Sequence, residues 1–258
     1  MNPGAPAGAS EASRVTVVAG DQALAQTLVD RFVAAAQEAV AERGAFRVAL
    51  AGGHTPEAAY AVLASAHRDG VPWEQIHVFW GDERPVAPDH PDSNYRMAAE
   101  ALLRHVSVPQ GQVHRMRGEA QDLEAAAADY AVELAHAFAI DTAGAPPVFD
   151  LVLLGMGAEG HTASLFPDSP VLGSHAWVAA PFVPQLGMRR LTLTPWVINA
   201  ARQVVFAVGG QNKAAALRAV LGPERQPERY PAQVVSPRQG VVEWLVERDL
   251  AQAAGLAG

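Results

Sequence analysis

Short apolar runs along the chain alternate with longer segments in which apolar residues recur every three or four positions. The runs predict strands over Arg14–Val18, Phe46–Leu50, Ile76–Trp80, Phe149–Leu154, Arg190–Leu193 and Gln203–Val208. The periodic segments predict helices over Asp21–Arg43, Thr55–His67, Ser93–Arg104, Asp122–Phe138 and Asn212–Leu221, with Thr55 as N-cap and Pro56 at the first helical position of the second. This alternation is typical of βα units around a parallel sheet, so we expect an α/β fold.

No internal repeat or low-complexity linker interrupts the pattern after the first dozen residues. We therefore expect a flexible tail over residues 1–13 and a single domain over residues 14–258. No apolar stretch approaches the roughly 18–20 residues of a membrane helix. The start, Met1–Gly8, has neither the basic nor the apolar region of a secretory signal, and cysteine is absent, which excludes disulfides and thiol catalysis. We expect a cytoplasmic protein.

The balance of charge limits the kind of partner. The net charge of −8 argues against nucleic acid, which needs a basic face. A phosphorylated ligand would need cations gathered locally against this repulsive field. The chain has 18 arginines but a single lysine, Lys213, which makes that lysine a candidate for function.

Two glycine pairs follow predicted strands and precede predicted helices, where a parallel sheet places its ligands. Gly52-Gly53-His54-Thr55 lets the backbone approach an anion at a helix N-terminus, although such a turn is also a common tight connection. Gly209-Gly210 leads to Lys213, a good phosphate partner at a helix start. Arg189 or Arg190 could add a guanidinium to the same site, and the sequence does not decide between them.

Two further loops carry groups suited to acid–base chemistry. Asp82, Glu83 and Arg84 form a polar loop directly after the third strand. The segment Gly155–Pro167 brings His161 to a strand end through three glycines, at the expected start of a short helix. A helix N-terminus would keep the imidazole of His161 neutral, whereas a nearby Glu or phosphate would favour its charged form. The sequence leaves this balance open.

Several familiar catalytic motifs are missing. The chain has no Gly-x-Ser-x-Gly elbow, no His-Glu-x-x-His or other close histidine pair, and no dinucleotide fingerprint. A neutral base, carboxylates and several cations remain. This set suits activation of water for attack on a reactive electrophile without covalent catalysis.

The ordered motifs resemble the 6-phosphogluconolactonase family. They are Leu50–Pro56, Asp82-Glu83-Arg84, Ser93-Asn94-Tyr95-Arg96, Gly155–Pro167 with its Gly-His-Thr-Ala-Ser-Leu-Phe-Pro string, Arg190–Thr194 and Lys213. The stretch Trp244–Ala254 also resembles the C-terminal helix of that family. The resemblance implies a modified Rossmann-like three-layer fold with a mainly parallel sheet flanked by helices. It also implies hydrolysis of 6-phospho-D-glucono-1,5-lactone, the second step of the pentose phosphate pathway, with no metal or organic cofactor.

The resemblance also implies roles for particular residues. His161 is similar to the general base, and Asp82 and Arg84 match the loop that shapes the sugar pocket; Glu159 is expected to join them as a catalytic residue. The residues similar to the phosphate site of the family are Gly52, Gly53, His54, Thr55, Arg190 and Lys213. Two residues depart from the pattern: His54 replaces a smaller or basic residue, and Glu159 replaces the usual Asp.

Two other functions remain to be separated from lactone hydrolysis. A glucosamine-6-phosphate deaminase would share the fold but is expected to carry a carboxylate after the histidine, in a Gly-His-Ile-Ala-Phe-Asn-Glu string; Thr162–Pro167 contains none. A sugar-phosphate-sensing domain would need an attached DNA-binding module. The expected partner is therefore a small phosphorylated sugar lactone, with no nucleic acid or membrane, and the expected state is a monomer or weak dimer.

Overall fold

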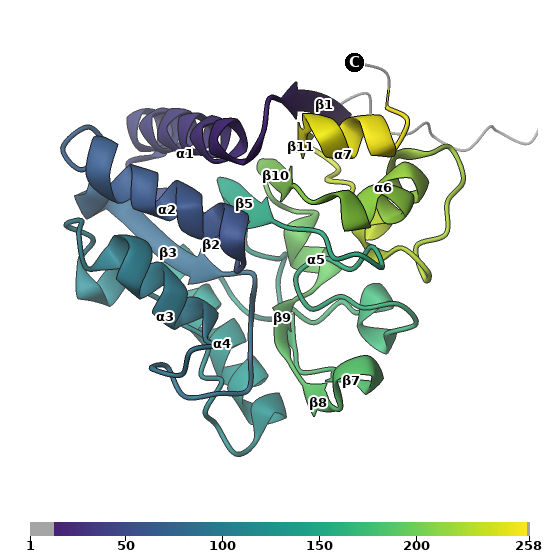
Figure 1. Ribbon diagram of the computed structural model, residues 1–258. Helices are drawn as coiled ribbons and strands as arrows, with labels where there is room; N and C mark the ends of the chain where they lie inside the picture. The colour runs from purple at the N-terminus through teal and green to yellow at the C-terminus, as the bar shows by residue number, and fades with distance from the viewer. Residues whose placement is uncertain (1–12, 257–258) are drawn as a thin grey trace, which may run out of the picture.

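A six-stranded, wholly parallel sheet forms the centre of the protein in the computed structural model, which describes residues 13–256 (Figure 1). Its strands lie in the order β1 (Ser13–Val18), β11 (Val241–Glu247), β10 (Gln203–Val208), β5 (Leu151–Leu154), β2 (Phe46–Leu50) and β3 (Ile76–Trp80). The two strands of each neighbouring pair run parallel to each other. The expected α/β fold around a parallel sheet is confirmed.

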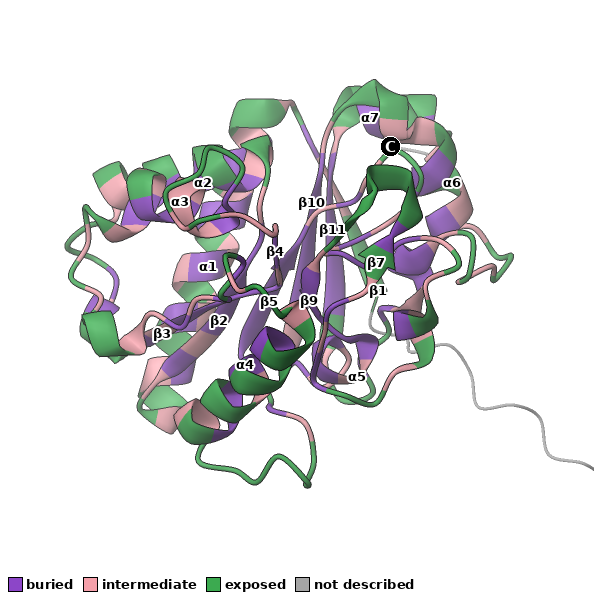
Figure 2. Cartoon of the chain, turned by 90° about the horizontal axis from the view of Figure 1, so that it is seen from below, coloured by how far each residue is buried: buried purple, intermediate pink, exposed green. Residues whose placement is uncertain are grey.

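Helices cover both faces of this sheet. One face packs on α1 (Asp21–Arg43), α2 (His54–Ala66) and α3 (Asn94–Ala98), which continues as a π-helical turn, Ala99–Leu103. The other face packs on α4 (Leu123–Phe138), α5 (Pro195–Ile198), α6 (Ala214–Leu221) and α7 (Arg248–Ala253). Figure 2 shows the buried strands in the middle of the molecule with helices on either side. These are the three layers that the resemblance implied.

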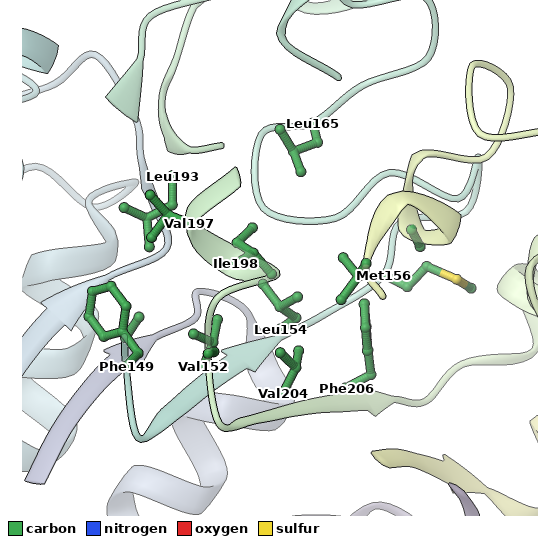
Figure 3. Close-up of a cluster of buried hydrophobic side chains, with 14 of the residues drawn as sticks. Phe149, Val152, Leu154, Met156, Leu165, Leu193, Val197, Ile198, Val204 and Phe206 are labelled. Atoms are coloured by element: carbon green, nitrogen blue, oxygen red, sulfur yellow. The ribbon is translucent and has the colours of Figure 1, made fainter. Parts of the chain in front are cut away.

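Strand β5 shows why the sheet needs both helix layers. All four of its residues are buried; Leu151 and Leu153 face the α1–α3 side, while Val152 and Leu154 face the α4–α7 side. A strand buried on both faces reads as a continuous apolar run, as this one does. Figure 3 shows Val152 and Leu154 beside Val204 and other side chains of the second core. Each fully buried Leu contributes about 1.5–3 kcal/mol of transfer free energy.

The long helices begin and end where local chemistry directs. Helix α1 ends at Gly44, whose φ of 74° is a left-handed C-cap. Helix α4 begins after Asp122, whose carboxylate accepts hydrogen bonds from the N–H groups of Glu124 and Ala125. Helix α2 differs from expectation, because it begins at His54 with Gly53 as N-cap, so Thr55 is already helical and caps nothing.

Two small sheets stand apart from the main one. In the first, β4 (Asp82–Glu83), β9 (Leu191–Leu193) and β6 (Val178–Ala179) pair antiparallel. The expectation of a polar loop at Gly81–Arg84 is therefore wrong in part, and the predicted strand Arg190–Leu193 lies outside the parallel sheet. The second pairs β7 (Phe182–Val183) with β8 (Met188–Arg189). Three-residue to four-residue 3₁₀ turns connect other elements, at Trp73–Gln75, Gln110–Gln112, Pro170–Gly173, Pro184–Leu186, Gln211–Lys213 and Pro231–Val234.

Two other expectations need correction or lie beyond the described residues. The stretch Trp244–Ala254 is not one helix, because Trp244 lies within β11 and stacks on Phe206 with ring centroids 3.8 Å apart. The tail expected over residues 1–13 falls on residues 1–12, which are outside the described part, and on Ser13, which opens β1. Within residues 13–256 no helix combines the length and apolar character needed to span a bilayer.

The sheet order creates a crevice between β5 and β2. From β2 the chain steps outward to β3, and from β5 it steps in the opposite direction to β10. Loops at the carboxyl ends of such strands part at this point, which is where open α/β sheets bind ligands.

Candidate active site

A cleft of about 270 Å³ opens at the carboxyl ends of four adjacent strands, β10, β5, β2 and β3. The segments that follow these strands all contribute to its wall. It is lined by Ala51, Gly52, Gly53, His54, Thr55, Pro56, Gly81, Asp82, Arg84, Asn94, Leu153, Leu154, Gly155, Met156, Gly157, His161, Ala163, Ser164, Phe166, Arg190, Ala207 and Lys213. Of the residues predicted for the site, all but Glu159 line the cleft.

The turn between β2 and α2 presents backbone donors to the cleft. Gly53 has a φ of 103°, a conformation that residues other than glycine rarely adopt. The first helical hydrogen bond runs from the N–H of Glu57 to the carbonyl of Gly53. The preceding N–H groups of His54 and Thr55 therefore have no partner inside the helix and lie at its positive end. The side chain of His54 is fully exposed, 3.8 Å from the carboxylate of Glu57.

A network of side chains fixes the carboxylate of Asp82. The hydroxyl of Ser164 donates to Oδ2 at 2.7 Å, and Nδ2 of Asn94 lies 3.3 Å from Oδ1 while donating to the Asp82 carbonyl at 2.9 Å. Each carboxylate oxygen thus has one side-chain donor. The remaining lone pairs can accept hydrogen bonds from a ligand in the cleft.

The neighbouring carboxylate, Glu83, faces inward. Its two oxygens accept from the N–H groups of Arg84, Asn94 and Tyr95 and from the hydroxyl of Ser93, and the residue is 2 % exposed. Burial raises the pKa of Glu83 above its ordinary value, against the lowering effect of the backbone donors. Arg84, next in the chain, lines the cleft while its Nη1 donates to the Asp92 carbonyl at 2.6 Å.

The loop after β5 carries His161 in a sharp turn. The expected helix start is absent, because Thr162 forms an isolated bridge with Leu165 and Ala163 has a φ of 47°. The imidazole stacks on Phe166, with ring centroids 4.2 Å apart. It also lies so close to Gly157 that a Cβ there would sit 2.1 Å from Nδ1. Position 157 must therefore be glycine for the imidazole to lie where it does.

Glu159 lies beside the same imidazole but outside the cleft lining. Its Oε1 is 3.0 Å from Nδ1 of His161, within ion-pair distance. Nδ1 is nevertheless a buried atom without a hydrogen bond of acceptable geometry. The contact is therefore a close approach of a carboxylate to Nδ1, one of the two ring nitrogens.

Two cations also line the cleft. Arg190 lines it, and its Nε and Nη1 are buried without a hydrogen-bond partner among the described residues. Burial, followed by the charge of Arg84, lowers its pKa. Lys213, in the turn before α6, also lines the cleft; burial lowers its pKa, and no carboxylate of residues 13–256 offsets that effect. Half-buried cations without a carboxylate partner favour an anionic ligand.

Arg189 points elsewhere. Its Nη1 donates to the Ala180 carbonyl at 2.7 Å and pairs with Glu124 at 2.9 Å. The structure therefore brings Arg190, and not Arg189, to the cleft. The cleft is thus lined by an imidazole, a fixed carboxylate, two cations and a helix N-terminus. No set of three His, Asp or Glu side chains in the described part converges to hold a metal ion.

Asn94, Ser164 and Phe166 line the cleft but were not among the predicted site residues. All three lie within motifs that carried the resemblance, Ser93–Arg96 and Gly155–Pro167. Their position within these motifs was the signal in the sequence that could have identified them as site residues. Their partners, Asp82 and His161, are distant in sequence or separated by a sharp turn, so only the fold shows the contacts.

Comparison with known proteins gives a consistent picture. Residues 19–244 match the family model described as glucosamine-6-phosphate isomerases/6-phosphogluconolactonase. A 6-phosphogluconolactonase of Synechocystis sp. is 44% identical over 239 residues, which cover 92% of this chain and 96% of the relative. One from Mycobacterium tuberculosis is 41% identical over 228 residues, covering 86% of this chain and 90% of the relative.

Solved structures agree with these relatives. The 6-phosphogluconolactonase from Trypanosoma cruzi superimposes with a TM-score of 0.83 at 27% identity, covering 93% of this chain and 96% of that one. A monomeric glucosamine-6-phosphate deaminase superimposes with a TM-score of 0.76 at 22% identity, covering 95% of this chain and 100% of that one. The second likeness shows a shared fold.

Proposed function

The chain belongs to the family of glucosamine-6-phosphate isomerases and 6-phosphogluconolactonases, and on that premise we propose that it hydrolyses 6-phospho-D-glucono-1,5-lactone to 6-phosphogluconate in the cleft described above. The observation that carries the proposal is the convergence of His161, Asp82, Arg190 and Lys213 on one cleft of about 270 Å³. That volume suits a single sugar phosphate. The named lactonases at 44% and 41% identity support the same activity.

The phosphate of the substrate binds between the α2 N-terminus and the two cations. The N–H groups of His54 and Thr55 donate to phosphate oxygens at the positive end of the helix. Arg190 offers Nε and Nη1, which otherwise lack partners, and Lys213 adds a compact charge. A phosphate dianion removes the cost of leaving these half-buried cations unpaired, and this gain opposes the repulsion from the net charge of −8.

His161 is the general base. With Glu159 beside Nδ1, the neutral ring takes a proton from water through Nε2 as the water oxygen attacks C1 of the lactone. The carbonyl oxygen becomes an oxyanion, which Arg84 or backbone N–H groups stabilise. The C1–O5 bond then breaks, the imidazolium returns its proton to the departing ring oxygen, and the carboxylic acid product ionises. Asp82 accepts hydrogen bonds from sugar hydroxyls and holds the ring in place.

Neither a metal nor an organic cofactor takes part in these steps. The lactone is already reactive toward water, so a positioned base that contributes roughly 10²–10⁴-fold is sufficient. We further propose that the protein works in the cytoplasm as a monomer or weak dimer on a phosphorylated sugar lactone.

The direct test generates the lactone in situ with glucose-6-phosphate dehydrogenase and follows the appearance of 6-phosphogluconate with and without the protein. We expect appearance to accelerate in proportion to enzyme concentration. A rate equal to spontaneous hydrolysis refutes the proposal. A parallel incubation with glucosamine 6-phosphate, followed by an ammonia assay, should release none, because Thr162–Pro167 supplies no carboxylate for ring opening.

A further inference from the structure

Asn94 occupies the space between two walls of the cleft. The residue is 2 % exposed, and its Nδ2 points at two oxygens of Asp82, which fixes the orientation of the amide. On its other side, Asn94 lies against the β2–α2 turn. A Cβ on Gly52 would fall 2.0 Å from Oδ1 of Asn94, and the three nearest atoms to that Cβ all belong to Asn94. The side chain therefore contacts both the sugar-facing carboxylate and the phosphate-facing turn.

Buried Glu83 fixes the backbone of Asn94. The N–H of Asn94 donates to Oε1 at 2.8 Å, and the N–H of Tyr95 donates to Oε2 at 2.8 Å. Ser93 caps the same helix start by accepting from the N–H of Arg96, while its hydroxyl donates to Glu83. The start of α3 is thus bound to β4, so the amide of Asn94 has little freedom to leave Asp82.

Asp82 depends on this support. Its two side-chain donors are Ser164 on Oδ2 and Asn94 on Oδ1. Loss of one donor lets the carboxylate rotate about its χ2 bond, which is a soft torsion. A rotated carboxylate no longer meets the hydroxyls of a sugar placed by its phosphate.

We propose that Asn94 is a positioning residue that holds the Asp82 carboxylate toward the sugar and sets its distance from the Gly52 turn. This inference rests on the proposed lactonase activity. Asn94 acts through Asp82, so its removal affects the binding of the sugar more than the chemical step.

Steady-state kinetics of Asn94→Ala test the proposal. We expect KM to rise about tenfold, the usual scale for one hydrogen bond to a charged group, with a smaller change in kcat. Asn199→Ala is the matched control, because Asn199 also bridges two loops, through Val234 and Ser236, outside the cleft. We expect it to lower the melting temperature and leave KM unchanged. An unchanged KM in Asn94→Ala, or an equal rise in the control, overturns the proposal.

A double-mutant cycle with Asp82→Ala separates positioning from a direct role of Asn94. When the carboxylate is absent, Asn94→Ala should change KM by less than about twofold. The same factor in both backgrounds shows that Asn94 acts independently of Asp82 and overturns the proposal.

Failure of the proposed function can be recognised separately. If the wild-type protein does not accelerate lactone hydrolysis, the activity is wrong, whatever the variants do. Calorimetric binding of 6-phosphogluconate then still tests Asn94. An affinity about tenfold lower in Asn94→Ala supports its positioning role, and equal affinities overturn it.

Discussion

Substitution of Gly157 by alanine perturbs the proposed base without touching its chemistry. The added Cβ would lie 2.1 Å from Nδ1 and 2.2 Å from Cε1 of His161, and 2.8 Å from Oε2 of Glu159. Ordinary contacts between such atoms begin at about 3.5 Å, so the ring must retreat by more than about 1 Å. Gly157 is not among the glycines with positive φ, so alanine introduces no backbone strain there.

A displacement of about 1 Å at a catalytic group can reduce turnover by about 100-fold, equivalent to about 2.7 kcal/mol of transition-state stabilisation. We therefore expect kcat of Gly157→Ala to fall by that order, with KM nearly unchanged because the added methyl group displaces the base and not the cations or the α2 N-terminus that are proposed to bind the phosphate. The assay is lactone hydrolysis with substrate generated in situ.

The control is Gly173→Ala, in the 3₁₀ turn Pro170–Gly173 outside the cleft, where a Cβ would meet no atom within 4 Å. It should retain full activity. If Gly157→Ala is folded by circular dichroism and keeps wild-type kcat, the imidazole is not held against this loop during turnover. The placement of the base is then wrong.

Three other predictions follow from the same structure. Lys213 is the single lysine, so reductive methylation with ¹³C-formaldehyde gives one side-chain NMR signal. Burial lowers the pKa of Lys213, so this signal should titrate below 10.5, and titration at the ordinary value contradicts the burial argument. Lys213→Ala should raise KM. Gly52→Ala must displace the side chain of Asn94 and should raise KM. In an Asn94→Ala background, Gly52→Ala should leave KM unchanged, because the space for the added methyl group is free. Additive effects on KM would show that the two side chains do not compete for this space. Burial, and then the neighbouring His114, lowers the pKa of His77 from 6.5 to about 4. Between these two values the unfolded chain binds a proton at His77 and the folded chain does not, so the free energy of unfolding decreases as the pH falls from 6.5 to about 4. The melting temperature of His77→Phe should therefore drop less between pH 7 and pH 4.5 than that of the wild type, and equal drops would contradict the shift.

Much of the fold follows from local pattern. Helix α1 and strands β2, β3 and β10 have the predicted bounds, because continuous apolar runs and a three-to-four spacing are properties of the segments themselves. The strand β11 could not be found in the same way. It contains Glu243, a buried carboxylate that is accommodated because Arg31 and Thr16, both far away in sequence, bind it.

The site shows the same division. Glycine clusters at strand ends indicated the loops that meet at the cleft, since glycine there signals close approach of the backbone. The sequence could not show that Gly157 makes room for His161, or that Gly52 makes room for Asn94. It also placed His161 at a helix start, whereas the left-handed conformation of Ala163 turns the chain away. Glu83 looked like part of a polar loop because three of its four donors, Ser93, Asn94 and Tyr95, follow only 10–12 residues later.

The central claim is that the imidazole of His161 accepts the proton of the attacking water. Its most direct test is the kcat of His161→Ala, measured with lactone generated in situ. A positioned base contributes about 10²–10⁴-fold, so we expect kcat to fall by that factor while KM stays within about twofold. Near-normal turnover in this variant would contradict the account, whatever the other residues of the cleft contribute.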